Sequence, residues 1–540
     1  MRCYLRAEPV RGHVEDGSTR YVATGGGLLV IERPVGVHGR VRRRHVTPCD
    51  GLPGADVRAV AIHEGRLHVA IWARGLYRRM DDGGFEPVTS AGATGLEWPT
   101  ALASLGGTLY VGTAYEGLFA LRAGAARRPS TAFRERAVLV LAAVPGGRLA
   151  IGRPDGLYLF RPRQRAVARI EERGISHVEL RDERTLLAFG EGTRCEVGLG
   201  SGDSGAVCAP VVGDPAGPPV EARGPGSNHV TTLAVRAGRL LVGTFDAGIA
   251  ETDGEHWSID RADDAPRWVN HLAVAEDGTT WVGAATGAYV LRGGRWRHYG
   301  RREGLPSSHV NAVARDSTGR AWLATGGGLV AIERDGAMRR ALRTEHGLPS
   351  HHVVSLAGGG GAALVAGTRF GLLAFDGDTG ARTASAARPS RLGHAATIAD
   401  GSLPDGWITA VHEGPREWVI GTYARGLARG TRDAQGRWHF APDARAPALW
   451  VNPNGITRVS VPQQDGSRIG VTVVMTLGDG VWVLRDGEER YVRAWFSDAL
   501  PSSDVTAAAS FAGRLWIGTR AGLVSLPLET LLAAQTRRTR

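Results

Sequence analysis

The chain has 540 residues, 43% of them hydrophobic, and carries 65 basic against 54 acidic side chains, a net charge of +11. This length exceeds what one hydrophobic core usually supports, so it predicts two domains or an array of repeats. No segment approaches the roughly 18 apolar residues of a membrane helix, and the start, MRCYLRAEPVRGHVEDG, lacks an apolar signal segment. Taken as it stands, the sequence predicts a cytoplasmic protein without a membrane span; a periplasmic location is the alternative if a signal segment was removed.

The basic residues are all arginines, because the sequence contains no lysine. They are spread along the chain without a recognition motif, so they predict solvated strand faces and argue against a nucleic-acid partner. Without lysine there is neither a P-loop nor Schiff-base chemistry, and no other motif predicts a cofactor or a metal. The four cysteines have no metal-site or disulfide-framework spacing, so we expect free thiols, with Cys195 and Cys208 pairing only in an oxidising compartment.

A repeated unit of short strands is predicted along the chain. A ten-residue phrase recurs as GLPGADVRAV from residue 51, GLPSSHVNAV from 304, GLPSHHVVSL from 347, SLPDGWITAV from 402 and ALPSSDVTAA from 499. Behind it come an apolar run ending in Gly-Thr or Ala-Thr, a turn, and Gly-Leu, as in LYVGTAYEGLFAL from 109. The turn glycine returns with a period of about 40 residues. Twelve units are marked by Gly27, Gly75, Gly117, Gly156, Gly192, Gly248, Gly287, Gly328, Gly371, Gly426, Gly480 and Gly522.

Inside one unit the hydrophobic period is two, which indicates β-strands. In the unit from 304 to 343 we predict strands at 310–315, 321–325, 329–333 and 338–342, joined by glycine-rich turns. Such a sheet cannot bury both faces alone, whereas sheets stacked radially around an axis can. The predicted fold class is all-β, a β-propeller of about twelve four-stranded blades in two tandem propellers. We place them at 1–262 and 263–540, with six blades each; seven and five is the near alternative.

Three longer segments interrupt the rhythm. Residues 198–228 and 379–402 are rich in glycine, proline or alanine and predict loops, whereas 443–468 is more apolar and predicts an ordered loop with a binding role. The last unit ends after its third strand, at Leu526. Because an open ring leaves sheet edges exposed, we expect the alternating residues 2–8 to complete the final blade.

GLPSSHVNAVARDSTGRAWLATGGGLVAIERDG, from residue 304, resembles the two-component regulator propeller repeat, as does ALPSSDVTAAASFAGRLWIGTRAGLVSL from 499. The resemblance covers 304–375, 402–430 and 499–526 well and most of the rest in phase. It implies seven-bladed propellers, often two in tandem, that act as extracytoplasmic ligand sensors ahead of a membrane helix and a histidine kinase. Since no membrane or kinase segment is present in these residues, the resemblance implies the fold and ligand sensing, but no phosphotransfer.

One polar or aromatic residue stands directly before or near the start of the inner strand in many units. Equivalent positions of innermost strands form a ring near one mouth of the channel, where histidine and aspartate could hold a metal or exchange protons. The alternative is a side chain that simply caps the turn. Because tryptophans at neighbouring positions cannot coordinate a metal, we expect the histidines to line the mouth and to bind no transition metal tightly. The candidates are Asp56, His177, His229, Trp268, His309, His352, Trp407 and Asp504.

Three functions compete at this stage. The leading hypothesis is a non-catalytic scaffold that holds a protein or a small ligand on its loop face. The second is a propeller enzyme, a lyase or hydrolase with histidine and aspartate at the channel mouth. The third is an extracytoplasmic ligand sensor of a signalling system.

Overall fold

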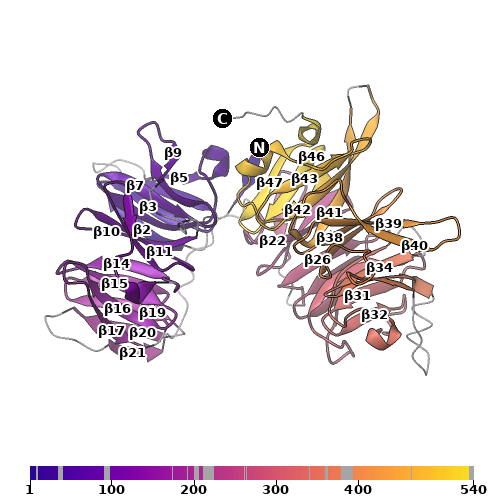
Figure 1. The fold of residues 1–540 in the computed structure, drawn as a ribbon, viewed down its shortest axis with the longest axis horizontal. Helices are drawn as coiled ribbons and strands as arrows, with labels where there is room; N and C mark the ends of the chain where they lie inside the picture. Colours follow the sequence, from indigo (N-terminus) through magenta and orange to yellow (C-terminus); the bar gives the residue numbers. More distant parts are fainter. Residues whose placement is uncertain are drawn as a thin grey trace. The chain divides into compact units, whose positions relative to one another are not determined.

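The computed structural model describes residues 1–5, 7, 10–33, 41–89, 96, 98–134, 136–172, 174–190, 193–199, 206–210, 224–260, 262, 264–339, 341–358, 363–378, 393–463 and 465–533. These residues form twelve antiparallel sheets, eleven with four strands and one with three (Figure 1). The sheets belong to two compact units. The five-bladed unit is Ala7–Glu221, and the seven-bladed unit combines Met1–Arg6 with Ala222–Arg540.

The five-bladed unit takes its blades from consecutive strands, with the innermost strand first in each blade. The 3-10 helices η1 (Pro48–Asp50) and η2 (Thr131–Phe133) lie in its connections. The blades are β2 (Val10–Asp16), β3 (Thr19–Thr24), β4 (Gly27–Glu32), β5 (Arg42–Val46); β6 (Val57–His63), β7 (Arg66–Ile71), β8 (Gly75–Arg79), β9 (Phe85–Pro87); β10 (Pro99–Leu105), β11 (Thr108–Thr113), β12 (Leu118–Arg122), β13 (Ala125–Arg127); β14 (Val140–Val144), β15 (Arg148–Arg153), β16 (Gly156–Arg161), β17 (Ala166–Glu171); and β18 (His177–Asp182), β19 (Thr185–Gly190), β20 (Thr193–Gly198), β21 (Ala206–Pro210).

The seven-bladed unit repeats this order, and its connections carry η3 (Thr344–His346), η4 (Trp495–Ala499) and η5 (Leu528–Leu532). Its blades are β22 (Val230–Arg236), β23 (Arg239–Thr244), β24 (Ile249–Thr252), β25 (Trp257–Ile259); β26 (Val269–Val274), β27 (Thr280–Ala284), β28 (Gly287–Arg292), β29 (Arg295–Tyr299); β30 (Val310–Arg315), β31 (Ala321–Thr325), β32 (Gly328–Ile332); β33 (Val353–Gly358), β34 (Ala363–Thr368), β35 (Gly371–Asp376), β36 (His394–Ala396); β37 (Ile408–Glu413), β38 (Trp418–Thr422), β39 (Leu427–Arg432), β40 (Trp438–Pro442); β41 (Val451–Pro462), β42 (Arg468–Thr476), β43 (Val481–Arg485), β44 (Val492–Arg493); and β45 (Val505–Phe511), β46 (Arg514–Thr519), β47 (Gly522–Pro527), β1 (Arg2–Tyr4).

The boundary between the units lies at 221/222, whereas the even division had put it at 262/263. The blade from β22 to β25 therefore belongs with the blades that follow it. It packs against the last blade of the chain, where β22 contacts β45 and β46. The fourth edge of the β30–β32 blade, predicted at 338–342, consists of the isolated bridges Ile332–Met338 and Leu329–Leu342.

The Gly-Thr and Ala-Thr landmarks of the sequence end the second strand of a blade. In eight blades the threonine hydroxyl donates to the carbonyl of the turn glycine that opens the third strand, as Thr519 does to Gly522 at 2.9 Å. The same hydroxyl accepts a turn N–H, as Thr519 does from Ala521 at 3.1 Å. A buried hydroxyl satisfied in both ways holds the turn closed, which explains why threonine recurs there.

The glycine before that threonine lets neighbouring blades approach closely. A Cβ on Gly243 would lie 2.7 Å from Cγ1 of Val269 in the next blade, and one on Gly518 would lie 2.5 Å from Cγ1 of Val230. The first inner-strand valine of one blade thus packs on the glycine of the preceding blade. Hydrophobic clusters accordingly span pairs of neighbouring blades, with Trp516 of the last blade in the same cluster as Val230 and Val242.

The seven-bladed unit is closed by its N-terminal strand. β1 pairs antiparallel with β47, with Tyr4 opposite Leu523, so the first residues of the chain form the outer strand of the last blade (Figure 1). The ring of Tyr4 stacks on Trp516 at 5.0 Å and contacts Trp257 at 5.5 Å. A Cβ on Gly224 would lie 3.6 Å from the carbonyl carbon of Tyr4. The chain therefore leaves this unit and returns to it at neighbouring points, and the five-bladed unit is an insertion between them.

The segment 443–468, expected to be an ordered loop, is mostly part of a blade. Its residues 451–462 form β41, whose pairing with β42 jumps from Val451–Thr476 to Ile456–Val474 and leaves a bulge at Asn452–Gly455. Nδ2 of Asn454 in this bulge donates to the carbonyl of Asn311, on β30, at 3.2 Å. β30 and β41 belong to blades three positions apart in a ring of seven, so this bond crosses the axis. The bulge therefore fills part of the central channel.

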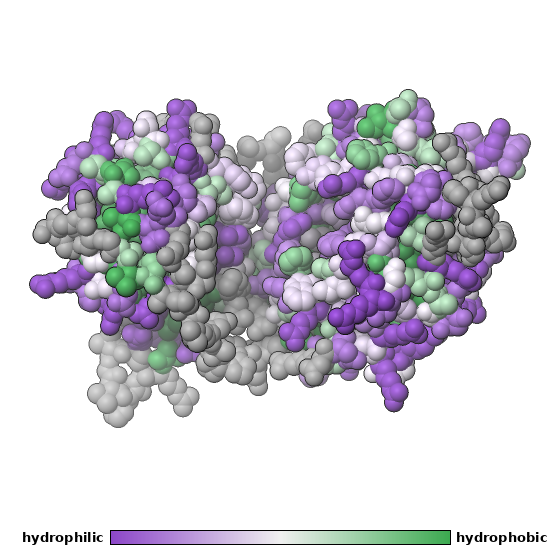
Figure 2. Space-filling view, turned by 90° about the horizontal axis from the view of Figure 1, so that it is seen from below, coloured by the Kyte–Doolittle hydropathy of each residue, from purple (hydrophilic) through white to green (hydrophobic). Residues whose placement is uncertain are grey.

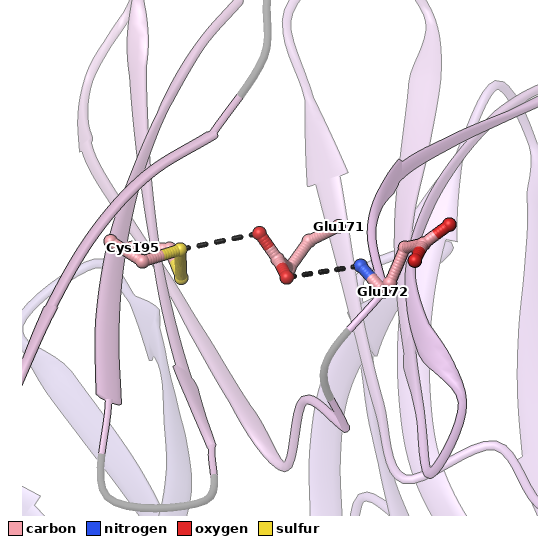
Figure 3. Close-up of a disulfide and its surroundings, with 4 residues drawn as sticks. Glu171, Glu172 and Cys195 are labelled. Atoms are coloured by element: carbon pink, nitrogen blue, oxygen red, sulfur yellow. Dashed lines mark hydrogen bonds between the residues drawn. A yellow bond between two sulfur atoms is a disulfide. The ribbon is translucent and has the colours of Figure 1, made fainter.

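A disulfide joins Cys195 on β20 to Cys208 on β21, which face each other across the strand pair. The expectation of free thiols is wrong, since none of the described cysteines is free. The two cysteines become neighbours only through the register of the outer strands, which their sequence spacing does not reveal. Oε2 of Glu171, at the end of β17 in the neighbouring blade, lies 3.2 Å from Sγ of Cys208, and Oε1 accepts the N–H of Glu172 at 3.0 Å (Figure 3).

The blades bury most of their hydrophobic side chains against one another. On the face shown in Figure 2, hydrophilic residues predominate and hydrophobic ones form small, scattered groups. No helix in the described part of the chain is long and apolar enough to span a membrane.

Candidate functional site at the mouth of the seven-bladed ring

One residue from each blade of the seven-bladed unit stands directly before the innermost strand, at one end of the ring. Six of their carbonyls accept the N–H of the residue that follows the second strand of the same blade, as Tyr423 donates to Trp407 at 2.9 Å. The backbone thus fixes these positions, and the side chains are free to vary. We call the set the mouth ring: His229, Trp268, His309, His352, Trp407, Trp450 and Asp504.

Six of the eight residues predicted from the sequence belong to the mouth ring. The other two, Asp56 and His177, lie in the five-bladed unit and belong to another set of inner strands. Asp56 forms ion pairs with Arg58 at 2.7 Å and Arg11 at 3.0 Å. His177 opens β18 and contacts Phe189 across the strand pair, with 5.6 Å between ring centroids. Neither residue is a member of the ring that contains His309.

Sequence analysis missed Trp450. It stands directly before Val451 and has the same register as Trp268 and Trp407, but the bulge after it hides the repeat. The phrase LWVNPNGI does contain the signal, a tryptophan followed by the first inner-strand valine. The four bulge residues separate that valine from the alternating pattern that identifies the other inner strands.

A column of stacked planar groups runs along part of the mouth. The guanidinium of Arg369 lies 4.7 Å from the ring of Trp407, which stacks on Tyr423 at 4.3 Å. Tyr423 stacks in turn on Trp450, with 5.6 Å between centroids and 28° between planes. The column spans three consecutive blades, and its last ring is half exposed, with 50% of Trp450 accessible.

Further aromatic surface surrounds the mouth. Trp268 and Phe245 are each 44% exposed, and Phe370, directly after Arg369, is 69% exposed. His229 stacks on Phe245 at 4.9 Å, and burial lowers the pKa of this histidine. Large aromatic side chains are seldom left exposed together without a partner, so this aromatic surface is suited to contact a ligand.

The charged groups of the mouth differ from one side to the other. Asp504 forms an ion pair with Arg520 at 2.6 Å and accepts Nδ2 of Asn452 at 2.8 Å, while burial raises the pKa of its carboxyl. His309, His352 and Arg369 lie on the other side. The pKa of His352 is lowered by burial first and then by the positive charges of Arg369 and His309, which places the three groups within electrostatic reach.

The mouth does not contain a metal centre among its described side chains. The described part of the chain has one group of three close metal-ligating residues, Glu171, Cys195 and Cys208, and two of these are joined as a disulfide. The histidines with the largest pKa shifts lie between blades: burial lowers the pKa of His271 and of His412 to about 4. Nδ1 of His271 accepts the N–H of Val313 in the next blade at 3.3 Å, which is a structural role for a neutral ring.

One segment of the sequence matches a propeller family. Residues 304–327 match the family described as Two component regulator propeller, and the chain carries repeats of this type in a β-propeller architecture. No curated protein matches the chain.

Several solved structures are similar in architecture. An extracellular domain of a hybrid two component system from B. thetaiotaomicron has 15% identity and a TM-score of 0.45, covering 98% of this chain and 78% of that one. PorZ, a surface component of the type-IX secretion system of Porphyromonas gingivalis, has 17% identity and a TM-score of 0.41, covering 96% and 73%. Virginiamycin B lyase from Staphylococcus aureus has 11% identity and a TM-score of 0.37, covering 55% and 94%.

The expected cytoplasmic location is contradicted. The Cys195–Cys208 disulfide is a bond that persists in oxidising compartments and is rare in the cytoplasm. The cytoplasmic expectation is based on the lack of an apolar segment at the start of the sequence. That feature gives no information about the compartment in which the blades fold.

Proposed function

We propose that the protein is a non-catalytic, sensor-like ligand-binding propeller that works outside the cytoplasm and binds its ligand at the mouth ring. The ligand is held by aromatic faces at one end of the seven-bladed unit, and the five-bladed unit is inserted into the sequence of that unit as Ala7–Glu221. The family repeat supports a propeller of the sensing type, and the disulfide supports the compartment.

The observation that carries this proposal is the exposure of three aromatic residues at one mouth: Trp268, Trp450 and Phe245. The tryptophans of the second strands, Trp322 and Trp516, are in contrast fully buried between blades. The mouth-ring backbone would accept any side chain, as the mixture of histidine, tryptophan and aspartate shows. Since exposed aromatic side chains leave apolar surface in contact with water, a ligand that covers them supplies the missing contacts.

The test is a thermal-shift screen of the purified protein with a panel of small sugars, amino acids and aromatic acids. A ligand of the mouth raises the melting temperature of the wild type, because it binds only the folded unit. We expect Trp450→Ala and Trp268→Ala each to need at least about tenfold more ligand than the wild type for the same rise in melting temperature. One aromatic anchor contributes on the order of 1.4 kcal/mol or more to the binding free energy.

The matched control is Trp495→Ala, which removes an exposed tryptophan of η4 outside the mouth ring. If a ligand stabilises the protein equally in the wild type and in both mouth variants, its site is elsewhere and the proposal fails. Turnover of a ligand by the wild type, abolished by His309→Ala, would instead support an enzyme.

A further inference from the structure

We propose that the mouth ring recognises an anionic ligand, through an oxyanion site formed by Arg369, His309 and His352. This inference deepens the proposed function, on which it rests, by naming the chemical class of the ligand. The class is a carboxylate, or another oxyanion of similar size, attached to a planar or apolar body.

The first argument is charge. Arg369 directly follows Thr368, which pairs with Val353, so the arginine and His352 extend the same two strands toward the mouth. His309 occupies the mouth-ring position of the neighbouring blade. No described acidic side chain forms an ion pair or hydrogen bond with any of the three, although most arginines near carboxylates in this protein are paired, as Arg520 is with Asp504. One arginine cation and two imidazoles that can donate N–H bonds, gathered without a counter-ion, form a site for an anion.

The second argument is the orientation of the arginine. Its guanidinium stacks 4.7 Å from the ring of Trp407, which holds the plane of the cation in place. A stacked guanidinium keeps its N–H edge free to donate, and that edge matches the two oxygens of a carboxylate. An exposed arginine without such a support loses more side-chain entropy when it binds an anion.

The third argument is an unsatisfied donor. Nε1 of Trp407 is buried and has no acceptor in the described part of the chain. A buried indole N–H normally finds a partner, and leaving one without costs roughly 1–3 kcal/mol. Because this donor has almost no accessible surface, a ligand oxygen would satisfy it only if the side chains that cover it move on binding.

The body of the ligand is argued from the surfaces beside the oxyanion site. Phe370, next to Arg369 in the chain, is the most exposed large aromatic side chain at the mouth, and the column through Tyr423 ends at the half-exposed Trp450. Planar or apolar groups attached to the anion would lie on these surfaces. The bulge at Asn452–Gly455 fills part of the channel behind the mouth, which favours a ligand held at the mouth.

The experiment compares three probes that separate charge from ring: benzoate, benzamide and acetate. Binding is measured by saturation-transfer NMR and by tryptophan fluorescence, with the full chain at low salt. We expect benzoate to bind at least about tenfold more tightly than benzamide, because a charge-assisted pair contributes roughly 1.5–3 kcal/mol. Acetate, which lacks a ring, should be weaker than benzoate, and added salt should weaken benzoate but not benzamide.

Arg369→Gln should reduce benzoate affinity to that of benzamide, and His352→Gln should reduce it by a smaller factor. The matched control is Arg468→Gln, which removes an exposed arginine that bonds Ser460 at the other end of the same ring. Equal binding of benzoate and benzamide, no binding of either, or equal effects of Arg369→Gln and Arg468→Gln would each overturn the anionic class. The proposed function is judged separately, because it requires only that Trp450→Ala weakens some ligand, of any charge.

Discussion

The two units are built from the same repeat, yet their blades are joined differently around the axis. In the seven-bladed unit the contacts between innermost strands run from β22 through β26, β30, β33, β37, β41 and β45 and return to β22. In the five-bladed unit they run from β2 through β6, β10 and β14 to β18, and among the described residues no contact of comparable extent joins β18 back to β2. The repeat therefore determines the blade, and other residues determine whether the ring closes.

One position accounts for much of this difference. In the seven-bladed unit, a polar side chain one or two residues after the first residue of the inner strand donates a hydrogen bond to the neighbouring blade. The acceptor is the carbonyl of the first inner-strand residue of that blade. Thr506 donates in this way to Val230 at 2.7 Å, across the junction between the last and first blades. Six of the seven junctions have such a bond, formed by Thr231, Asn270, Asn311, Ser355, Asn452 and Thr506. In the described part of the five-bladed unit, Thr100 forms the only bond of this kind, to Val138.

The end strands also differ in polarity. β18 has the sequence HVELRD, with four exposed residues at its end, and Leu180 is 41% exposed. The corresponding strand of the last ring blade, β45, is VTAAASF and is buried over its first four residues. Arg181 and Arg194 both pair with Glu196 on the exposed side of the terminal blade. Charged side chains of this kind keep an end blade from pairing with a further sheet.

The largest expected effect comes from removing the closing strand. Deleting residues 1–5 leaves β47 without a partner and removes Tyr4 from its stack with Trp516 and Trp257. We expect the seven-bladed unit to lose stability by up to about 3–5 kcal/mol, the cost of removing a fully buried aromatic side chain, because Tyr4 is partly buried against this cluster, and Tyr4→Ala to reproduce most of the loss. Calorimetry of Tyr4→Ala, which keeps the disulfide-bonded Cys3, should show a lower melting transition for this unit only. A truncated chain that melts like the full one would show that β1 does not close the ring.

A smaller effect is expected from the disulfide, and in the other unit. Replacing both Cys195 and Cys208 by alanine frees the outer strand β21, and closing a loop of this size contributes about 3 kcal/mol or less. The transition of the five-bladed unit should fall while that of the seven-bladed unit stays unchanged. Val207→Ala, an exposed change on the same strand, is the control. A loss of stability in the seven-bladed unit would contradict this assignment.

The smallest expected effect comes from removing one hydrogen bond between neighbouring blades, which can be done in either unit. Thr506→Val removes the bond across the closing junction and keeps the shape of the side chain, at a cost of about 1 kcal/mol. Thr100→Val removes the equivalent bond inside the five-bladed unit. We expect Thr506→Val to lower the seven-bladed transition in urea and to increase hydrogen exchange in both β22 and β45. If exchange rises in β45 alone, the bond does not join the two blades.

The blades could be predicted from the sequence because their cause is local. Alternating residues, turn glycines and the Gly-Thr landmark each act within about 40 residues, so they determine strands, turns and neighbours. The allocation of blades to units depends on contacts far apart in the chain, such as that between Val230 and Gly518. The prediction of six blades in each unit is based only on the total of twelve blades. The polar sequence of β18, in contrast, is a physical signal for the end of the first unit.

The candidate site was predicted in part for the same reason. Six mouth-ring positions follow from the repeat register, because that register places one residue of every blade at the same height. Trp450 was missed because of the bulge after it, and Asp56 and His177 were included because the register alone does not say which ring a blade joins. The pairing of Cys195 with Cys208 depends on two outer strands whose register the sequence does not specify.

The closing strand also sets an order of events during synthesis. β1 leaves the ribosome first, but its partner β47 is made near the end of the chain. The two strands therefore cannot pair until all the intervening residues have been translated. During that time the inserted five-bladed unit, whose contacts are between consecutive strands, can already be folded. A folded insertion shortens the effective loop between Tyr4 and Gly224, because it brings its own two ends together, and so reduces the entropy lost when the ring finally closes. The inserted unit, once folded, thus keeps β1 close to the seven-bladed ring that it later closes.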